Sequence, residues 1–300
     1  MTILKKITKS IKDKSLGYKI KKTLACHGIK NKNIRVLQEE QYAYDKLEKK
    51  YRNIIKEGVE IMPGKKSDKI WICWFQGEEN APPIVKACIN SVRKAFCDRE
   101  IIVLDGSTMY NYADFPDYIK EKYEKGVIPP AQFSDLLRLE LLCKYGGMWI
   151  DSTVLCTCTS DKISYITESD FFVYKEMDLI RRDKKSIAAS NWFIYSAANN
   201  PILMLTQRLL YSYWSEHTFL NNYFCFHLFF SMAAERYPEI WNSVPFYNNN
   251  SPHTLQFELD NTYNEKRWKQ LTEISDFHKL NRGANLNGDS FRSYIIKTYS

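Results

Sequence analysis

The 300-residue sequence lacks the features that mark an exported or membrane-spanning protein. No apolar run reaches the roughly eighteen residues that a membrane-spanning helix needs. The amino terminus has no compact apolar segment of the kind found in secretory signals. The eight cysteines form no CxxC pair, which disfavours a disulfide framework and favours reduced, buried thiols. We therefore expect a cytoplasmic protein.

Internal repeats, low-complexity tracts and recognisable nucleic-acid-binding modules are also absent from the sequence. The chain is instead 44% hydrophobic and 14% aromatic. That composition is sufficient for a large core, in one domain or in one domain with a smaller lobe. The absences exclude a repeat protein, and they leave a globular protein as the class to explain.

Positive charge is concentrated near the amino terminus of a chain whose formal net charge is +8. Asp13 is the one acid among the lysines at positions 5, 6, 9, 12, 14, 19, 21, 22, 30 and 32. Ile3, Ile7 and Ile11 recur every four residues, which predicts an apolar stripe on a helix. A basic amphipathic helix is typical of a peripheral anchor on an anionic membrane. A solvated basic tail or a nucleic-acid-binding arm is the alternative.

The sequence divides into two predicted parts. Residues 1–66 form a basic appendage with a helical pattern over 37–55, and they end in a Pro-Gly-Lys-Lys turn. Residues 67–300 form the expected catalytic domain. There, an apolar strand at 70–75, a helix opened by Pro82–Pro83 and a strand at 100–104 predict a βαβ unit. This unit favours an α/β fold with a mostly parallel sheet and a nucleotide-binding half.

Further elements follow from the same patterns. We expect helices at 117–125, 133–145, 201–215 and 222–236, and strands at 148–150, 171–174, 192–195 and 277–280. The strand at 148–150 is predicted to continue past Asp151 into 154–155. After Trp241 the pattern weakens into polar, Asn-rich segments, which we interpret as loops.

Asp151 is the most informative single residue, because it stands at the carboxyl end of a short buried strand. Ligands of open α/β sheets bind just outside that end. Asp151 and Thr153 would point to one side of an extended chain and could hold a divalent cation that carries a diphosphate. A turn-forming aspartate that bonds its own backbone is an equally open interpretation.

Polar residues elsewhere could line the same site. Asp135 and Arg138 share one helix face, either as a surface ion pair or as ligands for the hydroxyls of a sugar. Asn191, Trp192 and His227 are candidates for the acceptor side, although Trp192 and His227 are also typical core residues.

The central segment resembles the capsular polysaccharide synthesis glycosyltransferases and the related DXD sugar-binding region proteins. The match consists of Ser134–Asp135, Arg138, Tyr145–Gly146–Gly147, Trp149 and Asp151, together with the opening strand and the Gln76–Gly77 that follows it. The resemblance covers about residues 68–282. It implies a Rossmann-like fold of the glycosyltransferase A type and transfer of a hexose from a nucleotide sugar with retention at the anomeric carbon.

The resemblance also assigns roles to individual residues. Asp135 and Arg138 would contact the donor sugar and the ribose, and Asp151 would be the first acid of the DXD element. The segment around Trp74 to Gln76 would line the pocket of the base. The implied donor-binding residues are Trp74, Phe75, Gln76, Ser134, Asp135, Arg138, Gly147, Asp151, Ser152, Thr153 and Lys279, with Asp151, Asp135 and Arg138 as the catalytic set.

One departure concerns the metal site. Thr153 stands where the second acid of a DXD element would be, and a hydroxyl is a weaker ligand than a carboxylate. His278 is a candidate replacement, so Asp151, Thr153 and His278 form the predicted site for Mn²⁺ or Mg²⁺. Lys279 beside it would contact the diphosphate. An exposed His–Lys pair in a loop is the alternative.

The sequence thus predicts a retaining hexosyltransferase that acts in capsule or surface polysaccharide synthesis. UDP-galactose or UDP-glucose is the expected donor and a lipid-linked glycan is the expected acceptor, with no nucleic acid as a partner. The enzyme would lie on the inner face of the cell membrane. The alternative is a catalytically inactive protein whose basic arm binds a membrane or nucleic acid.

Overall fold

A five-stranded sheet lies at the centre of the computed structural model, which describes residues 3–62, 64–176, 186–283 and 288–300. The strand order is β2-β1-β3-β6-β5, with bounds β1 (Lys69–Cys73), β2 (Glu100–Leu104), β3 (Gly147–Ile150), β5 (Phe171–Lys175) and β6 (Ala189–Ser196). β1 is parallel to β2 and β3, whereas β6 is antiparallel to β3 and β5. The other strands therefore point one way and β6 opposes them, which confirms the predicted α/β class with a mostly parallel sheet.

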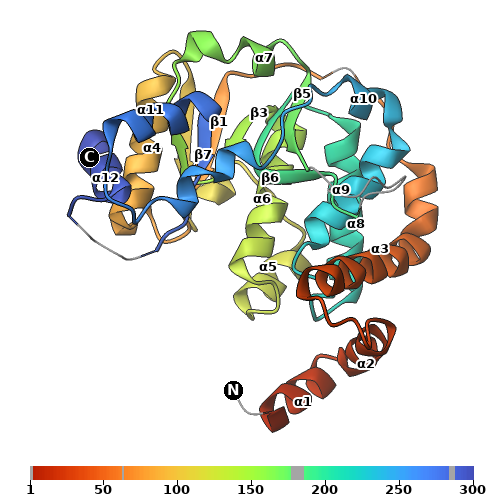
Figure 1. The fold of residues 1–300 in the computed structure, drawn as a ribbon. Helices are drawn as coiled ribbons and strands as arrows, with labels where there is room; N and C mark the ends of the chain where they lie inside the picture. The colour runs from red at the N-terminus through yellow and green to blue at the C-terminus, as the bar shows by residue number, and fades with distance from the viewer. Residues whose placement is uncertain (1–2, 63, 177–185, 284–287) are drawn as a thin grey trace.

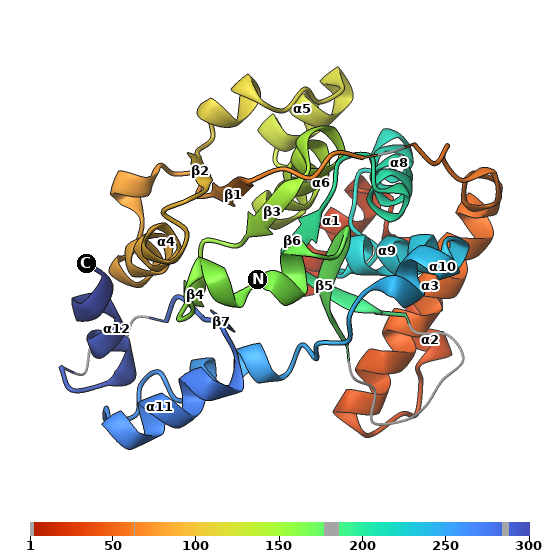
Figure 2. The same cartoon turned by 90° about the horizontal axis from the view of Figure 1, so that it is seen from above.

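Helices cover both faces of this sheet (Figures 1 and 2). Trp71 and Trp149 enter one core, and the alternate positions Ile72 and Ile150 enter the other. The first core is shared with α3 (Lys32–Glu57), α5 (Asp117–Glu124), α6 (Pro130–Tyr145), α8 (Pro201–Glu216) and α9 (Cys225–Arg236). The second is shared with α4 (Pro83–Ala95), α11 (Glu265–Ile274) and α12 (Phe291–Tyr299).

The predicted βαβ unit is confirmed as β1–α4–β2. The two strands pair in parallel from Lys69 opposite Glu100 to Cys73 opposite Leu104. α4 begins at Pro83, where a missing backbone N–H costs nothing. β1 ends at Cys73, two residues earlier than predicted, so the next residues form a loop at the carboxyl edge of the sheet.

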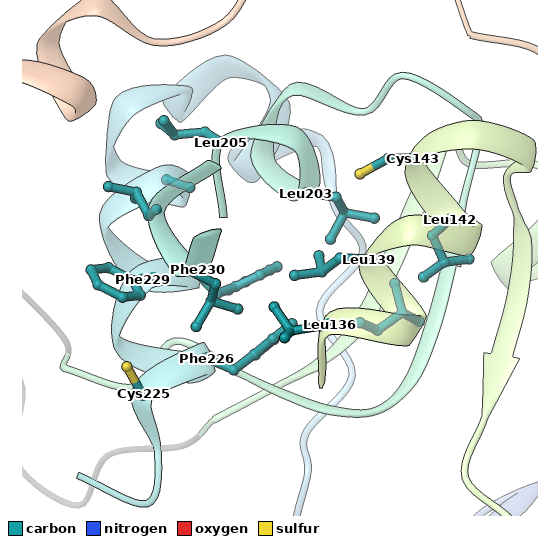
Figure 3. Packing of buried hydrophobic residues seen from close by; sticks show 14 of the residues in the cluster. Leu136, Leu139, Leu142, Cys143, Leu203, Leu205, Cys225, Phe226, Phe229 and Phe230 are labelled. Carbon is teal, nitrogen blue, oxygen red and sulfur yellow. The ribbon is translucent and has the colours of Figure 1, made fainter. Parts of the chain in front are cut away.

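α6 carries the central sequence signature and packs firmly against its neighbours (Figure 3). Three of its five buried leucines, Leu136, Leu139 and Leu142, pack in one cluster with Leu203 of α8 and Phe226 of α9.

Two glycines allow the chain to turn from α6 directly into β3. Their φ angles are +66° at Gly146 and +95° at Gly147, which other residues rarely adopt. A Cβ atom on Gly147 would lie 2.3 Å from the carbonyl oxygen of Lys69. The two glycines therefore fix where β3 ends and hence where Asp151 stands.

The predicted continuation of the strand beyond Asp151 is wrong. The N–H of Val154 donates to the carbonyl oxygen of Asp151 at 2.9 Å, so the chain turns there. The next strand, β4 (Val154–Cys156), leaves the main sheet and pairs antiparallel with β7 (Phe277–Lys279). Because of this turn, β7, which comes from near the carboxyl terminus, lies beside the residues that follow Asp151.

The interpretation of the segment after Trp241 as loops is also wrong. It contains the last residues of α10 (Pro238–Ser243), all of α11 and α12, and short 3-10 turns at Ser251–His253 and Leu255–Phe257. Side-chain caps start the two longer helices, because Asn264 accepts from the N–H of Arg267 and Ser290 from that of Ser293. Tertiary burial of Leu271 in α11 and of residues in α12 compensates for their weak apolar pattern. A further short helix, α7 (Ser164–Thr167), precedes β5.

The amino-terminal helices differ in how they contact the rest of the molecule. α1 (Ile3–Lys12) and α2 (Leu16–Ala25) extend away from it (Figure 1). α3 instead buries Tyr44, Leu47 and Tyr51 in the core that it shares with α9. The division predicted at residue 66 stays a prediction, but α3 packs as part of the main body. Over the described ranges, no helix has the length and apolar character required to cross a bilayer.

Candidate functional site

A cavity of about 730 Å³ opens at the edge of the sheet where β1 and β3 end and β6 begins. Of the residues predicted from the sequence, it is lined by Trp74, Phe75, Gln76, Ser134, Asp135, Arg138, Asp151, Ser152, Thr153, Asn191, Trp192, His227 and Lys279. Gly147 and His278 do not line it. Gly147 lies within β3 and acts through the turn that precedes Asp151.

Arg138 lies at the centre of the charged groups in this cavity. Its Nη2 is 3.4 Å from Oδ1 of Asp135 and 3.5 Å from Oδ1 of Asp151. The guanidinium lies 5.0 Å from the ring centroid of Trp149 and is 4% exposed. The Asp135–Arg138 pair is therefore buried rather than a surface ion pair, and it joins the two carboxylates in one network.

Asp135 is held by two neighbours in a dry environment. Nδ2 of Asn191 donates to its Oδ1 at 2.8 Å, and Arg138 lies on the other side. Burial raises the pKa of Asp135 to about 7, with Arg138 and Asn191 opposing the shift and Asp151 adding to it. Asn191 thus positions Asp135, and its predicted role on the acceptor side stays a prediction.

The pKa of Asp151 shifts in the opposite direction from that of Asp135, because the neighbouring cations have a larger effect than burial. Its Oδ1 accepts from Nε1 of Trp149 at 2.9 Å, and its Oδ2 accepts from Nζ of Lys279 at 2.6 Å. Burial raises the pKa of Asp151, but Lys279 and Arg138 together hold it below its usual value. The carboxylate is therefore ionised at neutral pH, and its oxygens accept hydrogen bonds from the side chains of Trp149 and Lys279.

Lys279 and His278 lie on opposite sides of β7. Nζ of Lys279 reaches the cavity and donates to Oγ1 of Thr153 at 2.8 Å. His278 is buried behind the strand, with Nε2 3.1 Å from Oγ1 of Thr157, and burial lowers its pKa to about 4. The metal-ligand role predicted for His278 is corrected by this arrangement, because neighbouring side chains of a strand alternate.

The oxygens around Asp151 do not fit a tightly held divalent cation. Mn²⁺ and Mg²⁺ prefer several oxygen ligands, with carboxylates prominent among them. Here Asp151 and Thr153 already contact the ammonium of Lys279. Within residues 3–62, 64–176, 186–283 and 288–300, no three His, Cys, Asp or Glu side chains gather as a metal site would require.

The cavity-lining residues on β6 and α9 carry neutral side chains. His227, on α9, is buried, and burial together with the charge of Arg138 lowers its pKa to about 3. Its Nδ1 has no hydrogen-bond partner among the described residues. Trp192 stacks on Tyr174 at 4.8 Å between ring centroids, and its Nε1 donates to Oδ1 of Asn249 at 2.7 Å. Trp192 therefore packs as a core residue and also lines the cavity, and its role on the acceptor side stays a prediction.

Several cavity residues were not predicted from the sequence. Asn249 and His253 come from the segment that we interpreted as loops, and Glu176 follows β5. Arg282 lies after β7, with its guanidinium 5.4 Å from the ring centroid of Trp74. Only tertiary packing brings these residues to the site. Only Arg282 could have been suspected from the local sequence, because it lies three residues after Lys279.

Comparison with protein families gives a match over most of the chain. The family described as "Capsular polysaccharide synthesis protein" matches residues 25–298. This range includes the cavity residues on β3, α6, β6, α9 and β7.

Curated proteins and solved structures give shorter or more distant similarities. The chain is 35% identical over 96 residues to the O-glycosyltransferase braB of Annulohypoxylon truncatum, covering 29% of this chain and 23% of the relative. It is 29% identical over 100 residues to the O-glycosyltransferase PaGT of Phomopsis amygdali, covering 30% and 25%. The matches thus span about a quarter of the length of these relatives. The PaToxG glycosyltransferase structure covers 81% of this chain and 87% of its own, at 15% identity and a TM-score of 0.37.

Proposed function

The chain belongs to the family of capsular polysaccharide synthesis proteins, and on that premise we propose that it is a glycosyltransferase that uses a nucleotide-sugar donor. We propose more narrowly that it transfers a hexose from UDP-galactose or UDP-glucose, with retention at the anomeric carbon. The acceptor in this proposal is a lipid-linked glycan of a capsule or other surface polysaccharide.

The convergence of Asp135, Arg138 and Asp151 on one cavity is the observation that carries the proposal. The three side chains come from α6 and from the end of β3, and Arg138 contacts both acids. A cavity of about 730 Å³ falls within the range found for small-molecule sites. Its position at the carboxyl edge of β1 and β3 is where α/β sheets bind nucleotides.

The arrangement of charge suits departure of a nucleoside diphosphate. Transfer breaks the bond between the anomeric carbon and a phosphate oxygen, so negative charge grows on the leaving diphosphate. Lys279 and Arg282 line the cavity and would stabilise that charge as it develops. Asp135 and Arg138 would hold the sugar hydroxyls, as an acceptor of hydrogen bonds and a rigid donor respectively. We name no protein nucleophile.

The test is release of free UDP by the purified full-length chain from a panel of UDP-sugars. We expect release with UDP-galactose or UDP-glucose, and faster release when a lipid-linked glycan is added. Failure of every sugar, together with no binding of UDP at millimolar concentration, would instead favour an inactive binding protein. That alternative is not favoured now, because the family match includes the whole cavity.

We also propose that the protein binds an anionic membrane surface through α1 and α2. Ile7 and Ile11 of α1 are exposed by 43% and 61%, and Ile20 and Leu24 of α2 by 51% and 68%. Exposed lysines accompany them at positions 9, 12, 14 and 21. Apolar side chains beside lysines favour the interface of anionic lipids.

Sedimentation with lipid vesicles tests the membrane proposal. We expect binding to vesicles that contain phosphatidylserine, and weaker binding to phosphatidylcholine alone or at high salt. The double variant Lys9→Glu and Lys12→Glu in α1 should bind much more weakly. The double variant Lys266→Glu and Lys269→Glu, on the exposed face of α11, is the matched control. Equal binding by all three proteins would contradict the proposal.

A further inference from the structure

Lys279 occupies the position that a divalent cation would occupy in this site. Its Nζ lies 2.6 Å from Oδ2 of Asp151 and 2.8 Å from Oγ1 of Thr153. These are the two oxygen-bearing side chains that the sequence assigned to a metal ion. The side chain of Lys279 is 21% exposed and lines the cavity, so a ligand in the cavity can reach it.

We propose that Lys279 replaces the metal ion, so that sugar transfer by this chain requires no divalent cation. This inference rests on the proposed function. The ammonium of Lys279 contacts the diphosphate of the donor and stabilises it as it leaves, while Asp151 and Thr153 hold the ammonium in place. The bond between the anomeric carbon and the phosphate oxygen breaks heterolytically, and its electron pair stays on that oxygen. The acceptor hydroxyl oxygen bonds to the anomeric carbon, and its proton passes to the departing phosphate oxygen.

The hydrogen-bond donors around Asp151 support the replacement of a divalent cation by Lys279. Trp149, Arg138 and Lys279 already engage its carboxylate, which reduces the lone pairs left for a metal. Thr153 offers a neutral hydroxyl where a second carboxylate would otherwise hold the ion. A divalent cation that entered between Asp151 and Thr153 would meet the positive charge of Lys279 within a few ångströms, and like charges disfavour such a site.

The backbone fixes Lys279 in this position. β7 pairs with β4 so that Lys279 stands opposite Val154, and the N–H of Leu280 donates to the carbonyl oxygen of Thr153 at 2.9 Å. Thr153 and Lys279 are therefore tied together through both main chain and side chain. A charge held in this way needs no reorganisation when the leaving group becomes more negative, which is the condition for effective electrostatic catalysis.

The first experiment compares the untreated protein with protein treated with EDTA. UDP binding is measured by calorimetry and UDP release from the donor sugar by a coupled assay, each with and without added Mn²⁺. We expect the affinity for UDP and the release rate to change less than twofold. Binding or release that disappears with EDTA and returns with Mn²⁺ would overturn the inference while leaving the proposed function intact. Loss of both under all conditions would instead contradict the proposed function.

The second experiment changes the residues themselves. Lys279→Ala should lower kcat by about 10²-fold, the usual effect of removing one preorganised charge or donor. Lys279→Arg should retain a larger share of the activity, and Lys269→Ala on α11 is the matched control. In the double variant Thr153→Asp and Lys279→Ala, which restores a second acid and removes the ammonium, Mn²⁺ should tighten UDP binding. Wild-type kinetics for Lys279→Ala, or no effect of Mn²⁺ on that double variant, would overturn the inference.

Discussion

The two walls of the cavity hold polar groups in opposite ways. On the wall formed by β3, β4 and β7, charged groups contact one another: Asp151 accepts from Lys279 at 2.6 Å and lies 3.5 Å from Arg138. On the wall formed by β6 and α9, the groups are neutral, and Nδ1 of His227 is buried without a partner among the described residues. Trp192 on that wall is already bonded to Asn249.

This difference indicates which part of the donor substrate each wall would bind. A fixed set of paired charges can stabilise a charged ligand group without rearranging, as a diphosphate requires. The neutral imidazole of His227 lines the cavity on the other wall and can exchange a hydrogen bond with a sugar hydroxyl. The charged wall should therefore govern the chemical step, and the neutral wall should govern the choice of sugar or acceptor.

The largest expected effect comes from Asp151→Asn on the charged wall. The change removes the charge that holds Lys279 and Arg138, so UDP release from the donor should fall by on the order of 10²- to 10³-fold. Far-UV circular dichroism should show an unchanged fold, because Asn is nearly isosteric with Asp. Asp117→Asn, at an exposed position in α5, is the matched control. Full activity of Asp151→Asn would remove the basis for calling this wall catalytic.

His227→Phe tests the neutral wall. Loss of one hydrogen bond to a neutral ligand group should raise the KM for the donor or acceptor by about tenfold, since such a bond contributes roughly 1–1.5 kcal/mol. UDP alone should bind as it does to wild type, because in the proposed function the diphosphate binds at the charged wall. His227→Gln, which keeps a donor and an acceptor, should restore part of the affinity. An equal loss of UDP binding in His227→Phe would erase the distinction between the walls.

The sequence predicted the charged wall better than the neutral wall, for physical reasons. Asp135, Arg138 and Asp151 lie on a helix and a strand joined by Gly146–Gly147, so local geometry alone brings them close. Lys279 was predicted by position, but the side of β7 that it occupies depends on pairing with β4, which could not be foreseen.

The neutral wall depends on contacts between distant parts of the chain. Asn249 is held by Trp192, which lies in β6, and by the carboxylate of Glu176, which follows β5. The helices α11 and α12 are short and have weak apolar periodicity. Their apolar side chains are buried by contacts with other parts of the chain. The turn after Asp151 also depends on a distant contact, because β4 pairs with β7 in a separate two-stranded sheet. This is why the predicted continuation of the strand past Asp151 was wrong.

The smallest expected effect concerns Asp135, which lies between the two walls and shares Arg138 with Asp151. Burial raises the pKa of Asp135 to about 7 in the folded protein, well above its value in an unfolded chain. The protonated form therefore stabilises the fold at low pH, and that contribution is lost as the pH rises through about 7. Asp135→Asn should remove this loss, because Asn remains neutral throughout.

Thermal unfolding between pH 4 and pH 8 measures this effect of Asp135. The Tm of wild type minus that of Asp135→Asn should decrease by a few degrees as the pH rises, with Asp117→Asn correcting for the change in net charge. An increase in that difference with pH would mean that Arg138 and Asn191 outweigh burial and keep Asp135 ionised. Asp135 would then belong with Asp151 on the charged wall, and the boundary between the walls would move to Asn191.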